Sequence, residues 1–198
     1  MDSPEMAGFV TWHIIAIFIP IFIIIYAITT RRDREAQNRF YQDYFRSRKK
    51  QFENRFFAIQ SRWIELGLEY VPYSNKIFIY GSCGNTLYFN VFYLIDGAVV
   101  RKHQVKSEGG HVCDVSAGRQ RTLLDNGLEE LKKMYLLFQE YKREMPKGIK
   151  LVYDVNTKTY NSDFSYDKKI FNANSTGESR FDKWYEEIQG EYNRGYDK

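Results

Sequence analysis

Cysteine and histidine are scarce in this chain of 198 residues, which holds two cysteines and three histidines. Cys83 and Cys113 could pair in an oxidising compartment, but in a reducing one we expect free thiols. His111, Cys113 and Asp114 stand within four residues, yet no second cluster completes a four-ligand metal site. A glycine-rich loop is the preferred interpretation of this segment, and we expect no metal and no cofactor.

Catalytic signatures are also missing. The sequence contains no Walker loop, no dinucleotide-binding fingerprint and no zinc-protease motif. The segment Gly81-Ser82-Cys83-Gly84 offers a nucleophile, but it lacks the spacing of a nucleophile elbow and no base accompanies it. We therefore interpret this segment as a hairpin turn. We predict that the protein is not an enzyme and has no catalytic residues.

Charged residues are absent from Phe9 to Ile28, a run of twenty residues. As a helix, this run spans roughly 30 Å, which matches the hydrocarbon core of a bilayer. Trp12 and Tyr26 stand near its ends, where aromatic rings favour the membrane interface. The sequence therefore predicts a transmembrane anchor in residues 1–30, of which residues 9–28 contact the lipid bilayer. A buried core helix is the alternative.

The segment 31–50 sets the expected orientation of this anchor. It carries eight Lys and Arg residues and three acids, whereas the residues before the run carry only Asp2 and Glu5. Positive flanks remain on the cytoplasmic side of a membrane. We therefore expect a single-pass protein with its N-terminus outside and its C-terminal domain in the cytoplasm. The long apolar core favours an uncleaved anchor over a signal peptide.

The excess of positive over negative charge is confined to this juxtamembrane segment. Residues 51–198 hold 21 Lys and Arg against 20 Asp and Glu, so that part of the chain is nearly neutral. A nucleic-acid surface would need a basic patch on the domain itself. We therefore expect no direct nucleic-acid partner.

Hydrophobic periodicity predicts the elements that follow the anchor. In residues 31–67, Tyr41, Phe45, Phe52 and Trp63 recur at helical spacing, and Gly67 is a plausible end. We interpret 31–50 as a basic helical stalk and 51–198 as an α+β domain. Further helices are predicted at 122–144, capped by Thr122, and at 179–193. Segments rich in β-branched and aromatic residues predict five strands, at 76–82, 86–95, 98–105, 149–155 and 159–166.

The resulting order is αβββαββα. Short connections such as Asp96-Gly97 are typical of hairpins, so we expect an antiparallel five-stranded sheet. We expect the helices to pack on one face of this sheet, as in other α+β domains.

The last third of the chain combines carboxylates with aromatic rings. Aromatic anchors ringed by acids suit a surface that docks a basic protein. The alternative is that the rings belong to the core and the acids are merely solvated. The candidate partner-binding residues are Asp163, Tyr166, Asp167, Trp184, Glu186 and Glu187.

Several stretches between about residues 57 and 184 resemble the YezG-like immunity proteins of bacterial polymorphic-toxin systems. RWIELGLEYV precedes the hairpin KIFIYGSCGNTLYFNVFYLIDG, and the helix LLDNGLEELKKMYLLFQEYKREM follows. The closest part is IKLVYDVNTKTYNSDFSYD, whose acidic-aromatic step is formed here by Phe164, Tyr166 and Asp167. Family members are typically soluble and acidic, whereas this chain has an apolar N-terminal run and a nearly neutral domain.

The resemblance implies a cytoplasmic protein that binds a cognate toxin, often a nuclease, and neutralises it by occlusion. Together with the predicted anchor, we expect such a protein to be held at the bacterial cytoplasmic membrane. Two other classes remain open. One is a single-pass membrane adaptor or envelope-complex subunit with a cytoplasmic protein-binding domain, and the other is an enzyme with an unrecognised site. The oligomeric state is open as well.

Overall fold

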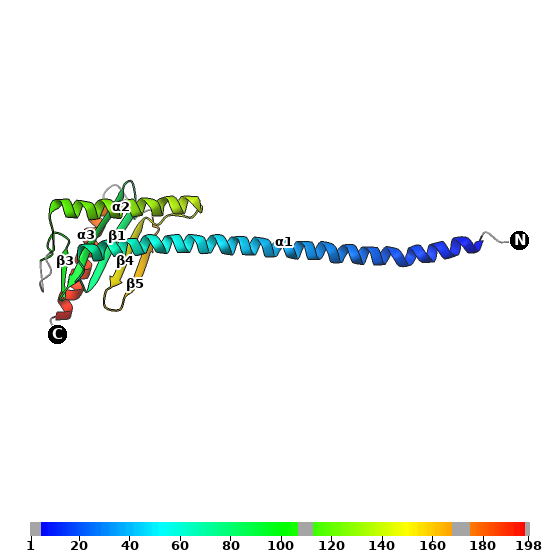
Figure 1. The fold of residues 1–198 in the computed structure, drawn as a ribbon, viewed down its shortest axis with the longest axis horizontal. Coiled ribbons are helices and arrows are strands. Elements are labelled where there is room, and N and C mark those ends of the chain that lie inside the picture. The colour runs from blue at the N-terminus through cyan, green and yellow to red at the C-terminus, as the bar shows by residue number, and fades with distance from the viewer. Residues whose placement is uncertain (1–4, 107–112, 168–174, 197–198) are drawn as a thin grey trace. The chain divides into compact units, whose positions relative to one another are not determined.

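The computed structural model describes residues 5–106, 113–167 and 175–196, without the side chains of residues 5–21, 23–25 and 195–196. The chain divides into two units, residues 1–51 and residues 52–198. The predicted element order is confirmed in this part of the chain (Figure 1). The elements are α1 (Glu5–Tyr70), β1 (Lys76–Cys83), β2 (Leu87–Ile95), β3 (Ala98–Arg101), α2 (Ala117–Glu140), β4 (Gly148–Asp154), β5 (Thr159–Ser165) and α3 (Gly177–Tyr196).

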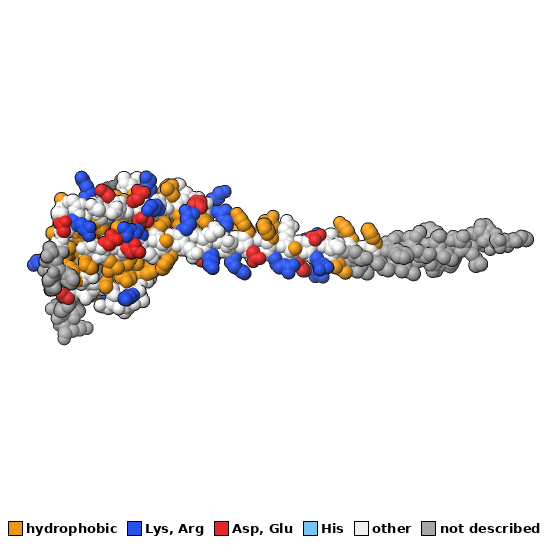
Figure 2. Space-filling model, viewed as in Figure 1, with side chains coloured by type: hydrophobic (Ala, Val, Ile, Leu, Met, Phe, Trp, Pro, Cys, Tyr) orange, Lys and Arg blue, Asp and Glu red, His pale blue; other side chains and the backbone are white. Residues whose placement is uncertain are grey.

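The first unit consists of the N-terminal part of α1. Neither proline nor glycine occurs between residues 21 and 66, so nothing in the backbone interrupts the helix there. Almost all side chains of residues 31–51 are exposed. Figure 2 shows hydrophobic side chains standing among Lys and Arg along this segment, and they include Phe40, Tyr41, Tyr44 and Phe45.

The structure describes the side chains of only part of the apolar run. Among the residues that the structure describes, no helix has a stretch long and apolar enough to cross a bilayer. Most of the run Phe9–Ile28 lies outside the described side chains. The transmembrane anchor therefore stays a prediction.

The second unit is built on one antiparallel sheet with the strand order β3-β2-β1-β4-β5. β1 lies at its centre and pairs with β2 through Ile79↔Val91 and with β4 through Ile79↔Leu151. β5 pairs with β4 through Lys150↔Asp163 and forms one edge of the sheet. The predicted five-stranded antiparallel sheet is thus confirmed.

Helices cover both faces of the sheet, so the expectation that they lie on one face is wrong. Ile77 and Ile79 of β1 face a core shared with α1 and α2. Phe78 and Tyr80, which alternate with them, face Phe181 and Trp184 of α3. The central strands are apolar on both faces, and each face needs cover from water.

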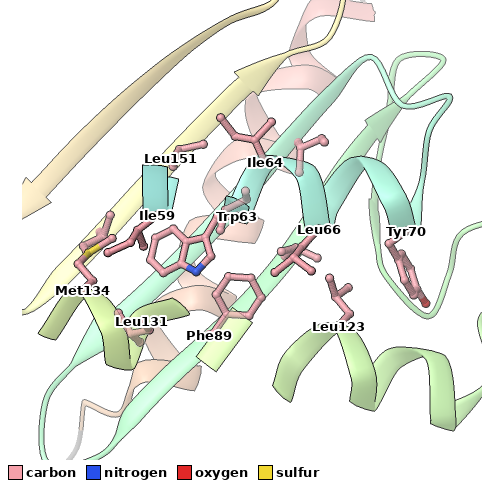
Figure 3. Close-up of a cluster of buried hydrophobic side chains, with 14 of the residues drawn as sticks. Ile59, Trp63, Ile64, Leu66, Tyr70, Phe89, Leu123, Leu131, Met134 and Leu151 are labelled. Carbon is pink, nitrogen blue, oxygen red and sulfur yellow. The ribbon is translucent and has the colours of Figure 1, made fainter. Parts of the chain in front are cut away.

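The first core is centred on Trp63 of α1. Figure 3 shows its indole beside Phe89 of β2 and Leu131 of α2. Trp63 is fully buried, and its Nε1 donates a hydrogen bond to the backbone oxygen of Gly127 at 3.0 Å. This bond satisfies the polar atom that a buried indole carries and ties α1 to α2.

Element ends differ from the predicted ones for local reasons. α2 begins at Ala117 instead of Thr122, because Ser116 caps it and accepts a hydrogen bond from the Arg119 backbone N–H. α2 ends at Glu140, because Lys142 adopts a φ of 51° and the chain turns there. β3 ends at Arg101 instead of Val105, because the Gln104 N–H bonds back to the Arg101 carbonyl.

Candidate functional site

The six predicted partner-binding residues are divided between the sheet's last strand and α3. Asp163 lies on β5, and Tyr166 and Asp167 follow that strand; all three are exposed. Glu186 and Glu187 are exposed on α3. Trp184 is buried with 5% exposure, since its ring packs against Phe78 and Phe92. The structure therefore makes Trp184 chiefly a core residue.

Two hollows bring different members of this set together. We call the first the charged hollow; it lies on the α3 side and has a volume of about 260 Å³. It contains Asp163, Trp184 and Glu187 of the predicted set but not the others. Its lining is Tyr80, Gly148, Lys150, Asp163, Ser165, Arg180, Lys183, Trp184 and Glu187.

Charges within the charged hollow largely balance one another. Lys150 Nζ lies 3.6 Å from Glu187 Oε2 and 5.3 Å from the centre of the Trp184 ring. The same lysine is the cross-strand neighbour of Asp163. Burial raises the pKa of Tyr80, although its hydrogen bond with Arg180 opposes this shift. Three bases and two acids share this space, so it presents no strong field to a single ion.

The second hollow is the aromatic groove, which has a volume of about 510 Å³ and contains Tyr166 of the predicted set. α1, the end of α2, the turn after α2 and the end of β5 contribute to it. Its lining is Phe52, Glu53, Phe56, Phe138, Arg143, Glu144, Phe164 and Tyr166.

Ring contacts fix the walls of the aromatic groove. Phe56 lies one helical turn after Phe52, so both rings project from the same side of α1. The Phe138 ring centre is 5.1 Å from that of Phe52 and 5.6 Å from that of Phe56. Phe164 of β5 closes the other side at 5.7 Å from Phe56. Centroid distances of this size are those of favourable aromatic pairs.

Charged groups stand around these rings. The Arg143 guanidinium carbon lies 3.9 Å from the Phe52 ring centre, in a cation–π position. Arg55 donates to both carboxylate oxygens of Glu140 at 2.8 Å, which joins α1 to α2 near the groove. Glu53 and Glu144 are at the groove as well. An apolar centre with a polar rim is the usual anatomy of a protein interface.

Part of the aromatic surface remains open to solvent. Tyr166 is 46% exposed, and Phe57, whose ring lies 6.1 Å from that of Tyr160, is 55% exposed. The surface therefore continues from the groove along β5. Sequence reasoning missed Phe52, Phe56 and Phe138 as site residues, because each also fits the buried stripe of its helix.

The structure gives little support to a catalytic role for the segment that offered a nucleophile. The segment Gly81–Cys83 belongs to β1 and is not a hairpin turn, which falls instead on residues 84–86. Burial raises the pKa of Cys83 to about 12, so its thiol carries no reactive thiolate at neutral pH. Both cysteines are free, as expected.

Metal ligands do not gather in the part of the chain that the structure describes. No group of three or more His, Cys, Asp or Glu residues there could hold an ion. His111 lies outside the described residues, so the cluster with Cys113 and Asp114 is not placed.

No family model matches the sequence, and no curated protein matches it. The resemblance to YezG-like immunity proteins therefore stays a prediction.

Proposed function

We propose that residues 52–198 form a protein-binding module whose docking surface is the aromatic groove. The observation that carries this proposal is one open groove at which the partly buried Phe56 and Phe164 and the exposed Tyr166 lie beside the buried rings of Phe52 and Phe138. Tyrosine and other aromatic residues dominate the energetic centres of protein interfaces. A monomer gains nothing from leaving a ring such as Tyr166 in water, whereas a partner that covers it gains buried apolar area.

The charge of the module supports a protein partner over a nucleic acid. Its 21 basic and 20 acidic residues give no excess of positive charge, and phosphate backbones are bound through such an excess. The carboxylates at the groove, Glu53 and Glu144, favour a partner with basic groups beside an apolar anchor.

We further propose that the partner is a cognate bacterial toxin and that the module neutralises it by occlusion. The support for this step is the resemblance of residues 57–184 to YezG-like immunity proteins. In this account Phe9–Ile28 spans the cytoplasmic membrane and the basic segment 31–50 holds the module on the cytoplasmic side. The support is the uncharged run of twenty residues followed by eight Lys and Arg.

Co-expression with the product of a neighbouring gene that is a candidate toxin tests the proposal. Cells that make the toxin together with the full chain should survive, and the two proteins should be recovered as a complex. Tyr166→Ala should weaken the complex at least about tenfold, as expected for an interface anchor. Leu136→Ala, which removes an exposed residue of α2 outside the groove, should leave binding unchanged.

Failure has two distinguishable forms. If no complex forms with any neighbouring gene product and cells are not rescued, the immunity proposal fails and a membrane adaptor becomes the better account. If a complex forms but Tyr166→Ala and Leu136→Ala behave alike, the aromatic groove is not the docking surface.

A further inference from the structure

The two edge strands of the sheet differ in how well they are protected from pairing with a further strand. β3 has four residues, and its Arg101 is held by Asp182 of α3 at 2.6 Å. β5 has seven residues, contains no proline, lysine or arginine, and follows β4 in unbroken register. In the described part of the chain, no strand pairs with the outer side of β5. A long, regular and unblocked edge is a template for another strand.

The hydrogen-bond pattern shows which groups β5 directs outward. Cys83 N–H donates to the Lys147 carbonyl and Val155 N–H to the Asn75 carbonyl, each at 3.0 Å. The odd-numbered residues of β4 therefore bond to β1, and the even-numbered ones bond to β5. Their partners on β5 are odd-numbered. It follows that Tyr160, Ser162 and Phe164 point their N–H and C=O groups away from the sheet.

Side chains on the two sides of this edge differ in chemistry. Tyr160 and Phe164 lie on the α1 side, next to Phe57 and Phe56. Asp163 is exposed on the α3 side, and no ion pair of its carboxylate is found among the described residues. An added strand would therefore meet aromatic rings on one face and the exposed carboxylate of Asp163 on the other.

We propose that β5 accepts an extended segment of the partner as a sixth strand. The segment alternates apolar residues, which pack on the aromatic side, with polar residues that place a basic side chain near Asp163. This inference rests on the proposed function, since it specifies how the partner of the aromatic groove is held. Backbone hydrogen bonds at Tyr160, Ser162 and Phe164 supply affinity, and the alternating side chains supply selectivity.

A synthetic peptide that alternates valine and lysine is the probe, titrated into the full chain in detergent micelles with empty micelles as the blank. Nuclear magnetic resonance should show slowed amide exchange at Tyr160, Ser162 and Phe164 when the peptide binds. Asn161 and Asp163, whose amides already face β4, should change little. The same peptide with N-methyl groups on every backbone amide keeps its charged and apolar side chains but can donate no backbone hydrogen bond from either edge, and it should not bind.

One pair of variants isolates the outward N–H of Ser162. Ser162→Pro removes that N–H at an edge position where proline is tolerated, and it should weaken peptide binding at least about tenfold. Ser162→Ala keeps the N–H and loses the hydrogen bond from Gln60 Nε2 at 2.9 Å, so it controls for the side chain and should bind like the wild type. Melting curves identify any variant that does not fold, and the exchange pattern of the wild type tests the proposal without variants.

Three outcomes overturn strand addition. These are absence of peptide binding, equal binding of the N-methylated peptide, and uniform exchange protection along β5. A wild-type chain that is dimeric and becomes monomeric with Ser162→Pro would make a second copy the occupant and also overturn it. In each case a Tyr166→Ala defect in the partner complex would leave the proposed function standing, so the two failures are distinguishable.

Discussion

At the scale of single residues, α2 lies close against the Phe89 ring at Gly127. Gly127 presents its backbone to the Phe89 ring, and its carbonyl accepts the Trp63 indole N–H. A methyl group at this position would overlap the Phe89 ring. Glycine is otherwise unfavourable inside a helix by about 1 kcal/mol, so its presence here reflects the approach of the two elements.

Gly127→Ala should therefore destabilise the module by about 1–3 kcal/mol, because the ring must move out of a filled core. Gly190→Ala is the matched control, since a methyl group there meets nothing within 4 Å and α3 is also helical. It should stabilise the module by roughly 0.5–1 kcal/mol. Denaturant unfolding of both variants checks the pair, and equal effects would contradict the packing described here.

The predicted site residues show where single-residue reasoning succeeds. Alternation along a strand predicts that Asp163 points to the face opposite to Tyr160 and Phe164. The structure agrees, and it shows that the Asp163 face is the one covered by α3. Alternation cannot tell whether Trp184 is an anchor or a core residue, because both roles need an aromatic ring on the apolar face of α3. In the structure Trp184 packs against the Phe78 and Phe92 rings, which makes it a core residue.

At the scale of elements, the turn between β4 and β5 depends on an ionised carboxylate. The backbone N–H of Thr157 and that of Asn156 both donate to Asp154 Oδ1 at 3.0 Å. The Thr157 bond is the largest cause of the lowered pKa of Asp154, and Lys76, 3.6 Å away, adds a smaller effect. The ionised carboxylate therefore stabilises the folded hairpin.

The unfolded-state pKa of Asp is near 3.9. A carboxylate whose pKa is lower in the folded state stabilises the fold fully at pH values above the unfolded-state pKa. This stabilisation is lost as the pH falls through the folded-state pKa. The melting temperature of the wild type should thus decline in this acid range, and that of Asp154→Asn should decline less. Lys76→Gln should keep most of the wild-type slope, because the backbone hydrogen bonds remain. Melting temperatures measured between pH 2 and 6, a range that brackets the Asp pKa, check this prediction. If the melting temperature falls equally steeply with pH for the wild type and Asp154→Asn, the stabilising role of the Asp154 carboxylate is refuted.

Element order could be predicted from the sequence, but the layering and the groove could not. Strands such as KIFIYGS are apolar on both faces, so both faces must be covered from water. The pattern does not indicate which helix covers which face. The aromatic groove draws Phe52, Phe138 and Phe164 from three distant segments. Each ring looks like an ordinary core residue in its own element, so only the packed structure reveals their gathering.

At the scale of the whole molecule, the distribution of charge predicts the orientation. Eight Lys and Arg follow the uncharged run and only two acids precede it, and such a bias retains the basic side in the cytoplasm. A reporter that works only in the cytoplasm should therefore be active when it is fused after Lys198. Activity of an exterior-specific reporter at the same position would contradict the predicted orientation.

We propose that this protein works by holding another protein at its aromatic groove, and photo-crosslinking in living cells is the most direct test. A photoreactive phenylalanine derivative replaces Tyr166 in one strain and Leu136 in another, since both positions are exposed and only the first lines the groove. We predict one discrete adduct with a second protein at position 166 and none at position 136. No adduct at position 166, or the same adducts at both positions, would contradict the account.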